Sequence, residues 1–277
     1  MISFFEALQT NPILFSALLA GLAASVVSGI IGSYVVVKRI VFMSGSISHA
    51  VLGGIGFALW LERAKGYSWI SPLYGALVTA LLSALIIGWI YLYYKEREDT
   101  VIAALWSIGM AIGIVFIAQT PGSNVELTNF VVGNILWVST SDLIILLSLD
   151  LFVCAAVFFL YNRFLAICFD EEQARLQGVS VNALYMLLLM LIAIAVVLLI
   201  QVVGVILVMT MLTIPPAIAN LVTTKLSRMM FLAMLLSMFF CIVGMGMAYH
   251  LDWPGGATIA LTAGLTYASA LLLSRIR

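Results

Sequence analysis

Residues 181–224 read VNALYMLLLMLIAIAVVLLIQVVGVILVMTMLTIPPAIANLVTT. Only Gln201 and Gly204 interrupt the middle of this apolar run, which is more than 40 residues long. A helix that crosses a bilayer needs roughly 20 mostly apolar residues. The run therefore predicts two membrane spans, 181–200 and 203–224, with a reversal of the chain between them.

The composition of the whole chain agrees with a lipid environment. Of 277 residues, 64% are hydrophobic and only 9% are charged, whereas soluble domains carry about 25% charged residues. Twelve Lys and Arg balance twelve Asp and Glu, so the basic excess that nucleic-acid binding requires is absent. The cysteines (Cys154, Cys168 and Cys241) are far apart and lack CxxC spacing, which excludes a dense disulfide framework and the usual structural zinc motifs.

The other apolar runs extend the pattern to about nine spans in a single membrane domain, 1–277. We place the spans at 12–37, 41–61, 70–94, 101–119, 142–161, 181–200, 203–224, 229–250 and 256–274. With nine spans, ten of the twelve Lys and Arg fall on one side. Because cytoplasmic loops retain cations, we expect the N-terminus outside and the C-terminus in the cytoplasm. The predicted fold class is an all-α polytopic membrane protein.

Two shorter segments do not fit a spanning pattern. Residues 129–138 (NFVVGNILWV) are too few to span and predict an outer interfacial or re-entrant helix. Residues 169–180 (FDEEQARLQGVS) predict a short cytoplasmic helix, because Asp170 is a good N-cap, Glu171 and Glu172 suit the first turn, and Gly178 is a stop signal. This helix is either an incidental part of a loop or a docking element for a cytoplasmic partner.

His49 is the first candidate for a functional residue within a span. It lies at helical spacing in a stripe of small residues with Gly45, Gly53 and Gly56. Ionisable side chains inside a bilayer usually face the bundle interior or a water-filled path. Imidazole binds divalent transition metals and also accepts protons. A neutral histidine that only bonds to a neighbouring helix is an equally good interpretation.

Three further acidic or basic residues are candidates, and so is one helix break. Asp150 lies in mid-span and either faces the path or makes an interhelical hydrogen bond. His250 and Asp252, at the outer end of the eighth span, are either solvated rim residues or a transient outer metal site. Pro215 and Pro216 remove two backbone donors and predict a kink or break in the seventh span, a common feature near translocation sites.

Several motifs for chemistry are absent from the sequence. No GxxxxGK[ST] loop occurs, because none of the four lysines follows a glycine, so any use of ATP must come from a partner chain. HExxH and GxSxG are absent as well. We therefore expect a transporter subunit and not an enzyme.

Five segments together resemble a known family. VVKRIVFMSGSISHAVLGGIGFAL (36–59), GNILWVSTSDL (133–143), FDEEQARLQGVS (169–180), VGVILVMTMLTIPPAIA (203–219) and YHLDWPGGATI (249–259) occur in this order. The order and the motifs are similar to those of the zinc/manganese/iron permeases of bacterial ABC transporters, over about residues 15–274. SHAVLGG (48–54), the FDEEQARLQG helix and the proline-containing span are the most specific elements.

The resemblance implies a set of partners and a fold. It implies two copies of the permease, or this chain with a paralogous permease, in the bacterial plasma (inner) membrane, with cytoplasmic ATP-binding subunits. It also implies an external solute-binding protein that delivers Mn²⁺, Zn²⁺ or Fe²⁺, no intrinsic cofactor, and a fold like that of the vitamin B12 importer (type II). The residues placed in a groove of the ATPase would be Asp170, Glu171, Glu172, Ala174, Arg175 and Gly178.

The resemblance also implies that His49 meets the ion, with one departure from the family pattern. Many members carry an aspartate one helical turn before this histidine, where this chain has Gly45 beside Ser44 and Ser46. Ser46 is a further candidate for the metal path. A second ligand would then come from another span, and Asp150 is the candidate. Alternatively, the ion passes with little coordination.

Two other functions fit the same composition. In an ion- or proton-coupled secondary transporter, Asp150 and His49 would relay protons. An ABC importer of a metal chelate such as cobalamin, haem or a siderophore would need a wide path, whereas the closely spaced glycines of the second span favour a small ion.

Overall fold

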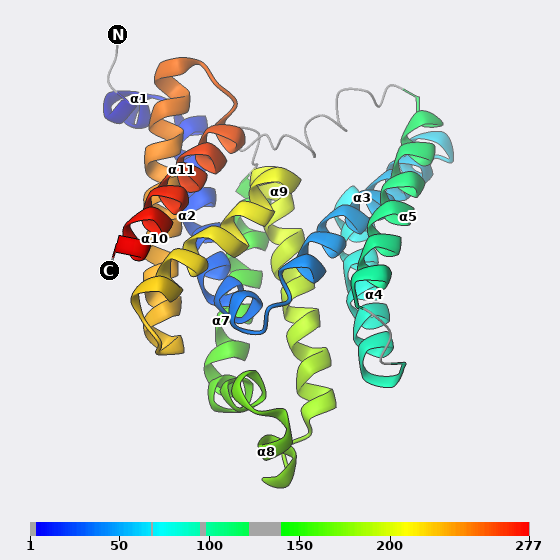
Figure 1. Cartoon of the computed structure of the whole chain (residues 1–277). Coiled ribbons are helices and arrows are strands. Elements are labelled where there is room, and N and C mark those ends of the chain that lie inside the picture. The colour runs from blue at the N-terminus through cyan, green and yellow to red at the C-terminus, as the bar shows by residue number, and fades with distance from the viewer. Residues whose placement is uncertain (1–3, 68, 95–97, 122–139, 277) are drawn as a thin grey trace. The chain divides into compact units, whose positions relative to one another are not determined.

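The computed structural model describes residues 4–67, 69–94, 98–121 and 140–276, and its regular structure in these ranges is helical (Figure 1). The helices are α1 (Phe4–Thr10), α2 (Pro12–Val37), α3 (Val41–Ala64), α4 (Pro72–Tyr93), α5 (Glu98–Ala118), α7 (Thr140–Phe169), α8 (Glu171–Leu176), α9 (Val181–Val222), α10 (Leu226–Leu251) and α11 (Gly255–Ile276). The predicted helix at 129–138 lies outside the described residues.

Within the described ranges, nine helical segments are long and apolar enough to cross a membrane. Their bounds follow the nine predicted spans closely, which confirms the all-α polytopic fold class. The largest difference is the fifth, which continues to Phe169 instead of ending near 161. The helix continues through the exposed Asn162 and Arg163 because polar residues of this kind still propagate a helix beyond the apolar region.

Local capping explains where two of the spans begin. The Asn11 side-chain oxygen accepts a hydrogen bond from the backbone N–H of Ile13 at 3.0 Å, and Pro12 starts α2. Ser71 uses its hydroxyl oxygen to accept from the N–H of Leu73 at 3.2 Å, with Pro72 at the start of α4. A polar cap followed by proline is a strong helix start, because proline lacks an N–H that would remain unpaired there.

The chain divides into two compact units. The first comprises residues 1–37, 129–155 and 198–277, and the second comprises 38–128 and 156–197. Both α7 and α9 therefore contribute one part to each unit. The single permease domain stays a prediction.

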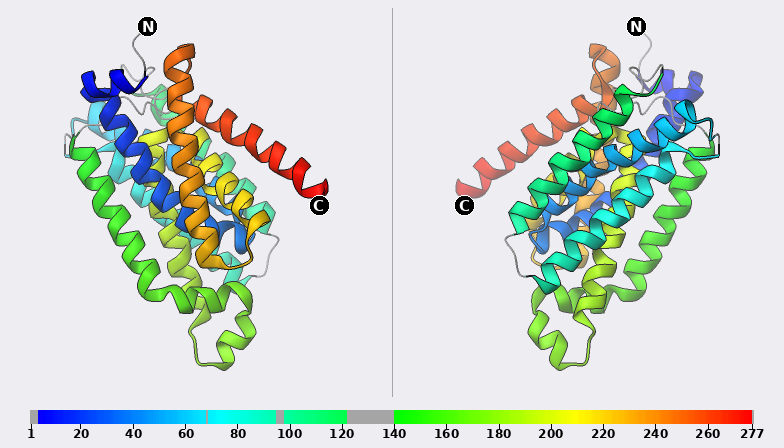
Figure 2. Two further views of the ribbon diagram at one scale, coloured as in Figure 1. Left: turned by 90° about the vertical axis from the view of Figure 1, so that its left-hand side faces the viewer. Right: turned by 90° about the vertical axis from the view of Figure 1, so that its right-hand side faces the viewer.

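In the first unit, α2 packs along α10, and α11 packs on α10 as well (Figure 2). A methyl group on Gly29 would lie 2.5 Å from the backbone nitrogen of Met234, so only glycine permits this approach. Close by, the Ser28 hydroxyl donates to the Ser237 hydroxyl at 3.3 Å. Small residues and interhelical hydroxyl bonds replace the hydrophobic driving force that is missing in lipid.

The chain leaves helical geometry inside α9 where a reversal between 181–200 and 203–224 was predicted, and it does not break at Pro215 and Pro216. The backbone of α9 stays helical through both prolines, and the residue that leaves helical geometry is Gly204, with φ 77° and ψ 165°. Proline has a helical φ, so it removes hydrogen bonds without forcing the chain out of the helix. Pro216 leaves the Leu212 carbonyl without its usual donor, and the backbone of Gly32 on α2 lies against that carbonyl and the Pro216 ring.

In the second unit, α3 packs between close neighbours, α4 and α5 (Figure 1). A methyl group on Gly53 would lie 2.8 Å from the carbonyl oxygen of Gly109, and one on Gly56 would lie 2.6 Å from that of Gly113. On its other side, α3 meets α4 where Gly54 lies against Gly75. The small-residue stripe of the second span therefore fixes α3 by direct backbone contact.

Candidate functional site

The imidazole of His49 is held by an aromatic ring. His49 on α3 stacks on Trp106 of α5, with ring centroids 4.1 Å apart and an interplanar angle of 13°. Its Nδ1 atom is buried and has no hydrogen-bond partner among the residues that the structure describes. Because the lone pair of an imidazole nitrogen lies in the ring plane, stacking on Trp106 fixes the direction in which a ligand can approach. The structure therefore keeps one nitrogen of a half-buried histidine available.

Trp106 is a residue that motif reasoning did not find. Tryptophan is enriched at the edges of membrane spans, but Trp106 lies six residues into the span Thr100–Ala118. Three residues after Trp106 comes Gly109, which contacts α3. A tryptophan away from the edge of its span, on the same face as an interhelical glycine, is the signal that identifies it.

Asp150 is buried without a partner. The residue is 7% exposed in the middle of α7, and neither carboxylate oxygen has a hydrogen-bond partner. The interhelical hydrogen bond that was the alternative interpretation is therefore absent from the part of the chain that the structure describes. A buried carboxylate without a partner carries a large desolvation cost, so a protein gains nothing in stability by keeping it.

Two of the other predicted path residues, Ser46 and Asp252, make hydrogen bonds within the protein, and the third, His250, is exposed. The Ser46 hydroxyl donates to the Ile102 carbonyl at 3.0 Å and joins α3 to α5. Asp252 is the left-handed C-cap of α10, with φ 56°, and its N–H donates to the Ala248 carbonyl. His250 is exposed in the last turn of α10. Among the described residues, no three His, Cys, Asp or Glu come together in a way that could hold a metal ion.

The predicted capped helix in 169–180 is present as α8. Asp170 is its N-cap, and one carboxylate oxygen accepts from the N–H of Gln173 at 2.9 Å. Gly178 has φ 78°, its N–H donates to the Arg175 carbonyl at 3.0 Å, and the N–H of Val179 donates to the Ala174 carbonyl at 3.0 Å. This pair of bonds is the Schellman motif, which requires a left-handed residue such as glycine. Six residues therefore form a helix with both ends closed.

A chain of contacts links α8 to the helix that carries His49. Glu171 forms an ion pair with Lys38, whose side chain is only 11% exposed. The Lys38 ammonium lies 5.7 Å from the centroid of the Tyr185 ring, and the Tyr185 hydroxyl donates to the sulfur of Met43 at 3.6 Å. Met43 is buried near the start of α3. We call Glu171, Lys38, Tyr185 and Met43 the α8–α3 network.

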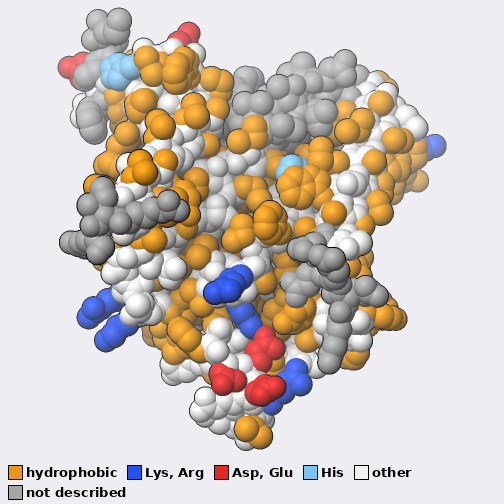
Figure 3. Space-filling model, viewed as in Figure 1, with side chains coloured by type: hydrophobic (Ala, Val, Ile, Leu, Met, Phe, Trp, Pro, Cys, Tyr) orange, Lys and Arg blue, Asp and Glu red, His pale blue; other side chains and the backbone are white. Residues whose placement is uncertain are grey.

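Charged side chains gather over α8, whereas the nearby helical surfaces are largely apolar (Figure 3). Asp170, Glu172 and Arg175 are exposed there. Leu176 is 89% exposed in the same short helix. A single exposed leucine is common on protein surfaces, so the charged residues are what distinguish the surface of α8.

Comparison with known proteins identifies the family of the chain. Residues 10–274 match the model of the ABC 3 transport family. The chain is similar to the "Probable metal transport system membrane protein" of Chlamydia trachomatis, with 48% identity over 95% of this chain and 90% of the relative. It is also similar to the manganese transport system membrane protein MntC of Halalkalibacterium halodurans, with 33% identity over 98% and 90% of the two chains.

The fold is similar to that of a solved structure. PsaBC from Streptococcus pneumoniae, solved in complex with Fab, superposes with a TM-score of 0.85 and 30% identity, over 98% of this chain and 94% of that chain. The family match covers nearly the whole sequence, and the spans found in the structure are those of a multi-pass membrane protein. The chain therefore belongs to the ABC 3 transport family.

Proposed function

We propose that this chain, a permease subunit of a metal ABC transporter, carries Mn²⁺, Zn²⁺ or Fe²⁺ into a bacterial cell with energy from ATP hydrolysed by a partner subunit. The observation that carries the proposal is the α8–α3 network, which joins a capped, charged helix outside the apolar spans to the helix that holds His49. The name of the manganese transport relative supports the class of cargo.

The expected assembly has several parts. The distribution of Lys and Arg supports an outer N-terminus and a cytoplasmic C-terminus, which puts α8 in the cytoplasm. There α8 meets an ATP-binding subunit, and an external solute-binding protein delivers the ion on the opposite side. A second copy of the chain, or a paralogous permease, completes the membrane part. The single domain 1–277 and the outer helix at 129–138 belong to the same proposal.

Coupling begins at α8. We infer that Asp170, Glu171, Glu172, Ala174, Arg175 and Gly178 form or shape the surface that the ATPase moves. An ion pair that is partly shielded from water is stronger than a fully exposed one, so a displacement of Glu171 carries Lys38 with it. Lys38 lies three residues before α3 begins, so movement of α8 reaches the start of α3.

In the path, we propose that His49 and Asp150 contact the ion one after the other or together. Gly45 replaces the family aspartate, so α3 offers one strong ligand, held in place by Trp106. A site with only one or two ligands binds a dication weakly, and weak binding favours release into the cell. Most nitrogen and oxygen sites bind Zn²⁺ more tightly than Fe²⁺ or Mn²⁺, so selection among the three ions falls mainly to the binding protein. Ser46, His250 and Asp252 remain secondary candidates for contact with the ion.

Reconstitution tests the function. Vesicles that contain the permease, its ATPase and the binding protein are expected to accumulate radioactive or fluorescent-reported Mn²⁺, Zn²⁺ or Fe²⁺ only when ATP is present. Separate omission of the ATPase and of the binding protein should each abolish uptake. Uptake driven by a proton gradient without ATP would instead identify a secondary transporter. Uptake of a metal chelate but not of the free ion would identify a chelate importer.

A further inference from the structure

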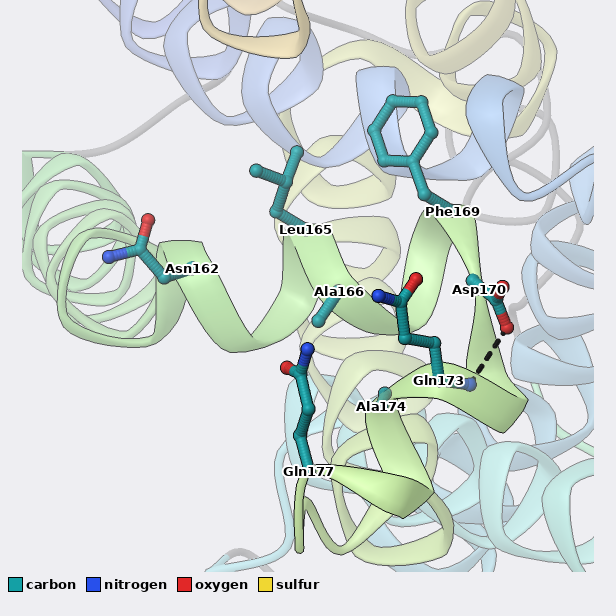
Figure 4. A pocket seen from close by; sticks show the side chains of 8 residues that line it. All are labelled: Asn162, Leu165, Ala166, Phe169, Asp170, Gln173, Ala174 and Gln177. Carbon is teal, nitrogen blue, oxygen red and sulfur yellow. Dashed lines mark hydrogen bonds between the residues drawn. The ribbon is translucent and has the colours of Figure 1, made fainter.

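A pocket of about 350 Å³ lies beside α8. It is formed by the last turns of α7 and by α8, both in the second compact unit (Figure 4). The lining residues are Asn162, Leu165, Ala166, Phe169, Asp170, Gln173, Ala174 and Gln177. We call this hollow the α7–α8 pocket.

The lining of the α7–α8 pocket is apolar at its base and polar around it. Ala174 is 1% exposed, and Leu165 and Ala166 are half-buried. The amides of Asn162, Gln173 and Gln177 and the Asp170 carboxylate are exposed. Figure 4 shows the two glutamine amides on the same side as Ala166. Such a lining suits a side chain with an aliphatic stem and a polar head.

The charge around the pocket favours a cation. No Lys or Arg in the described part of the chain lines it. Glu171 is already paired with Lys38, and Arg175 donates to the Asn182 side chain at 3.0 Å. Among the residues that the structure describes, neither Asp170 nor Glu172 forms an ion pair. The C-terminal end of α7 and the N-terminal end of α8 both lie here, and because these opposite dipole ends offset each other, the Asp170 carboxylate sets the local charge.

We propose that the α7–α8 pocket receives an arginine side chain of the cytoplasmic ATPase subunit. This inference rests on the proposed function, because it needs an ATPase that docks on α8. The arginine stem packs on Leu165 and Ala174, and the guanidinium donates to Asp170 and to the amide oxygens around it. Arginine fits better than lysine because its five donors lie in one plane and can serve several acceptors. The Phe169 ring, 67% exposed at the edge, offers a face for the same cation.

The central variant is Gln177→Lys, which puts a cation in the pocket and leaves the Asp170 cap intact. A matched control is Ala183→Lys, which adds the same charge to an exposed position in the first turn of α9, outside the pocket lining. The full-length permease in detergent is titrated with the ATPase subunit. We expect Gln177→Lys to weaken binding by at least about tenfold, since like charges in an interface are strongly unfavourable, and Ala183→Lys to leave the dissociation constant unchanged.

A second variant keeps the test valid if Gln177→Lys does not fold. Gln177→Glu adds negative charge beside Asp170, and we expect it to bind the ATPase at least as tightly as wild type and with a steeper salt dependence. A photo-reactive residue at position 177 should cross-link to an arginine-containing peptide of the ATPase, and an Arg→Glu change there should restore binding to Gln177→Lys.

Two results would overturn the pocket assignment. One is equal binding by Gln177→Lys and Ala183→Lys, with Gln177→Glu unchanged in its salt dependence. The other is a cross-link from position 177 only to lipid, which would make the occupant a cationic lipid headgroup. In both cases wild-type permease still binds the ATPase and transports metal, so the proposed function stands. Failure of the proposed function gives a different pattern, in which the wild-type chain neither binds an ATPase nor shows ATP-dependent uptake.

Discussion

His49 depends on a ring contact for its orientation, because its buried Nδ1 has no hydrogen-bond partner. Metal-binding histidines usually have a second interaction that fixes the ring, and the stack on Trp106 supplies one without using a nitrogen atom. The stack therefore holds the ring in place while no described residue uses the lone pair of its buried Nδ1.

The replacement His49→Ala tests this role. We expect metal uptake to fall by at least about tenfold, by analogy with the loss caused by removing groups that support metal ligands, while the complex still assembles. Gly264→Ala provides the control, since nothing lies within 4 Å of a methyl group placed there and the residue has no proposed part in the path. Normal uptake by His49→Ala would reduce His49 to a packing residue.

A substitution at Asp150 tests separately whether its carboxylate affects the stability of the protein and whether it affects transport. A buried carboxylate without a partner is destabilising, so Asp150→Asn should raise the thermal midpoint of the purified protein, by about 2–4 °C for each kcal/mol recovered. The same change should lower uptake, because an amide binds a dication more weakly than a carboxylate. Glu62→Gln is the control, since it removes a carboxylate charge from a half-buried residue near the end of α3 that has no proposed part in the path. A less stable Asp150→Asn with normal uptake would show that the carboxylate serves structure.

At the scale of elements, the contact of α3 with α5 is closely fitted. A methyl group on Gly53 would lie 2.8 Å from the Gly109 carbonyl oxygen. A carbonyl oxygen this close to the position of the methyl group leaves no space for a side chain on Gly53. His49 on α3 and Trp106 on α5 flank this contact, so its integrity also sets the geometry of the stack.

We expect Gly53→Val to destabilise the protein by about 1–3 kcal/mol or more, the usual cost of overpacking. The thermal midpoint in detergent measures the effect. Gly264→Ala is the matched control, because nothing lies within 4 Å of a methyl group placed there. Equal midpoints for the two variants would mean that α3 and α5 are farther apart than the structure has them.

The elements that local sequence determines could be predicted. The nine spans follow from hydropathy, and α8 follows from Asp170 and Gly178, because a helix cap and a Schellman stop each depend on a few neighbouring residues. The interruption of α9 near Gly204 could be predicted from the length of the apolar run, but the helical course through Pro215 and Pro216 could not. Proline removes donors but keeps a helical φ, whereas Gly204 alone adopts a positive φ within that helix.

Contacts between distant residues were beyond sequence reasoning. Lys38 and Glu171 are 133 positions apart, and no motif connects them. Trp106 and His49 meet only because glycines bring α3 and α5 together. Among the candidate path residues, the type and burial of His49 and Asp150 could be anticipated, but the absence of hydrogen-bond partners required a structure.

For the whole molecule, the central idea is that the energy of ATP hydrolysis enters at α8 and reaches the ion path through the α8–α3 network. Coupling between sites requires a physical connection whose arrangement both sites influence. Here an ion pair, a cation over an aromatic ring and a hydroxyl–sulfur hydrogen bond form that connection within one compact unit. Loss of the connection should leave ATP hydrolysis active but no longer productive.

The most direct test is a charge exchange, with metal uptake and ATP hydrolysis measured in the same reconstituted vesicles. Lys38→Glu and Glu171→Lys each place two like charges together, and we expect each to lower the number of ions imported per ATP hydrolysed. The double variant restores the ion pair in reverse and should recover much of the wild-type ratio. Single variants that transport with the wild-type ratio, or a double variant that is no better than either single variant, would contradict coupling through this pair.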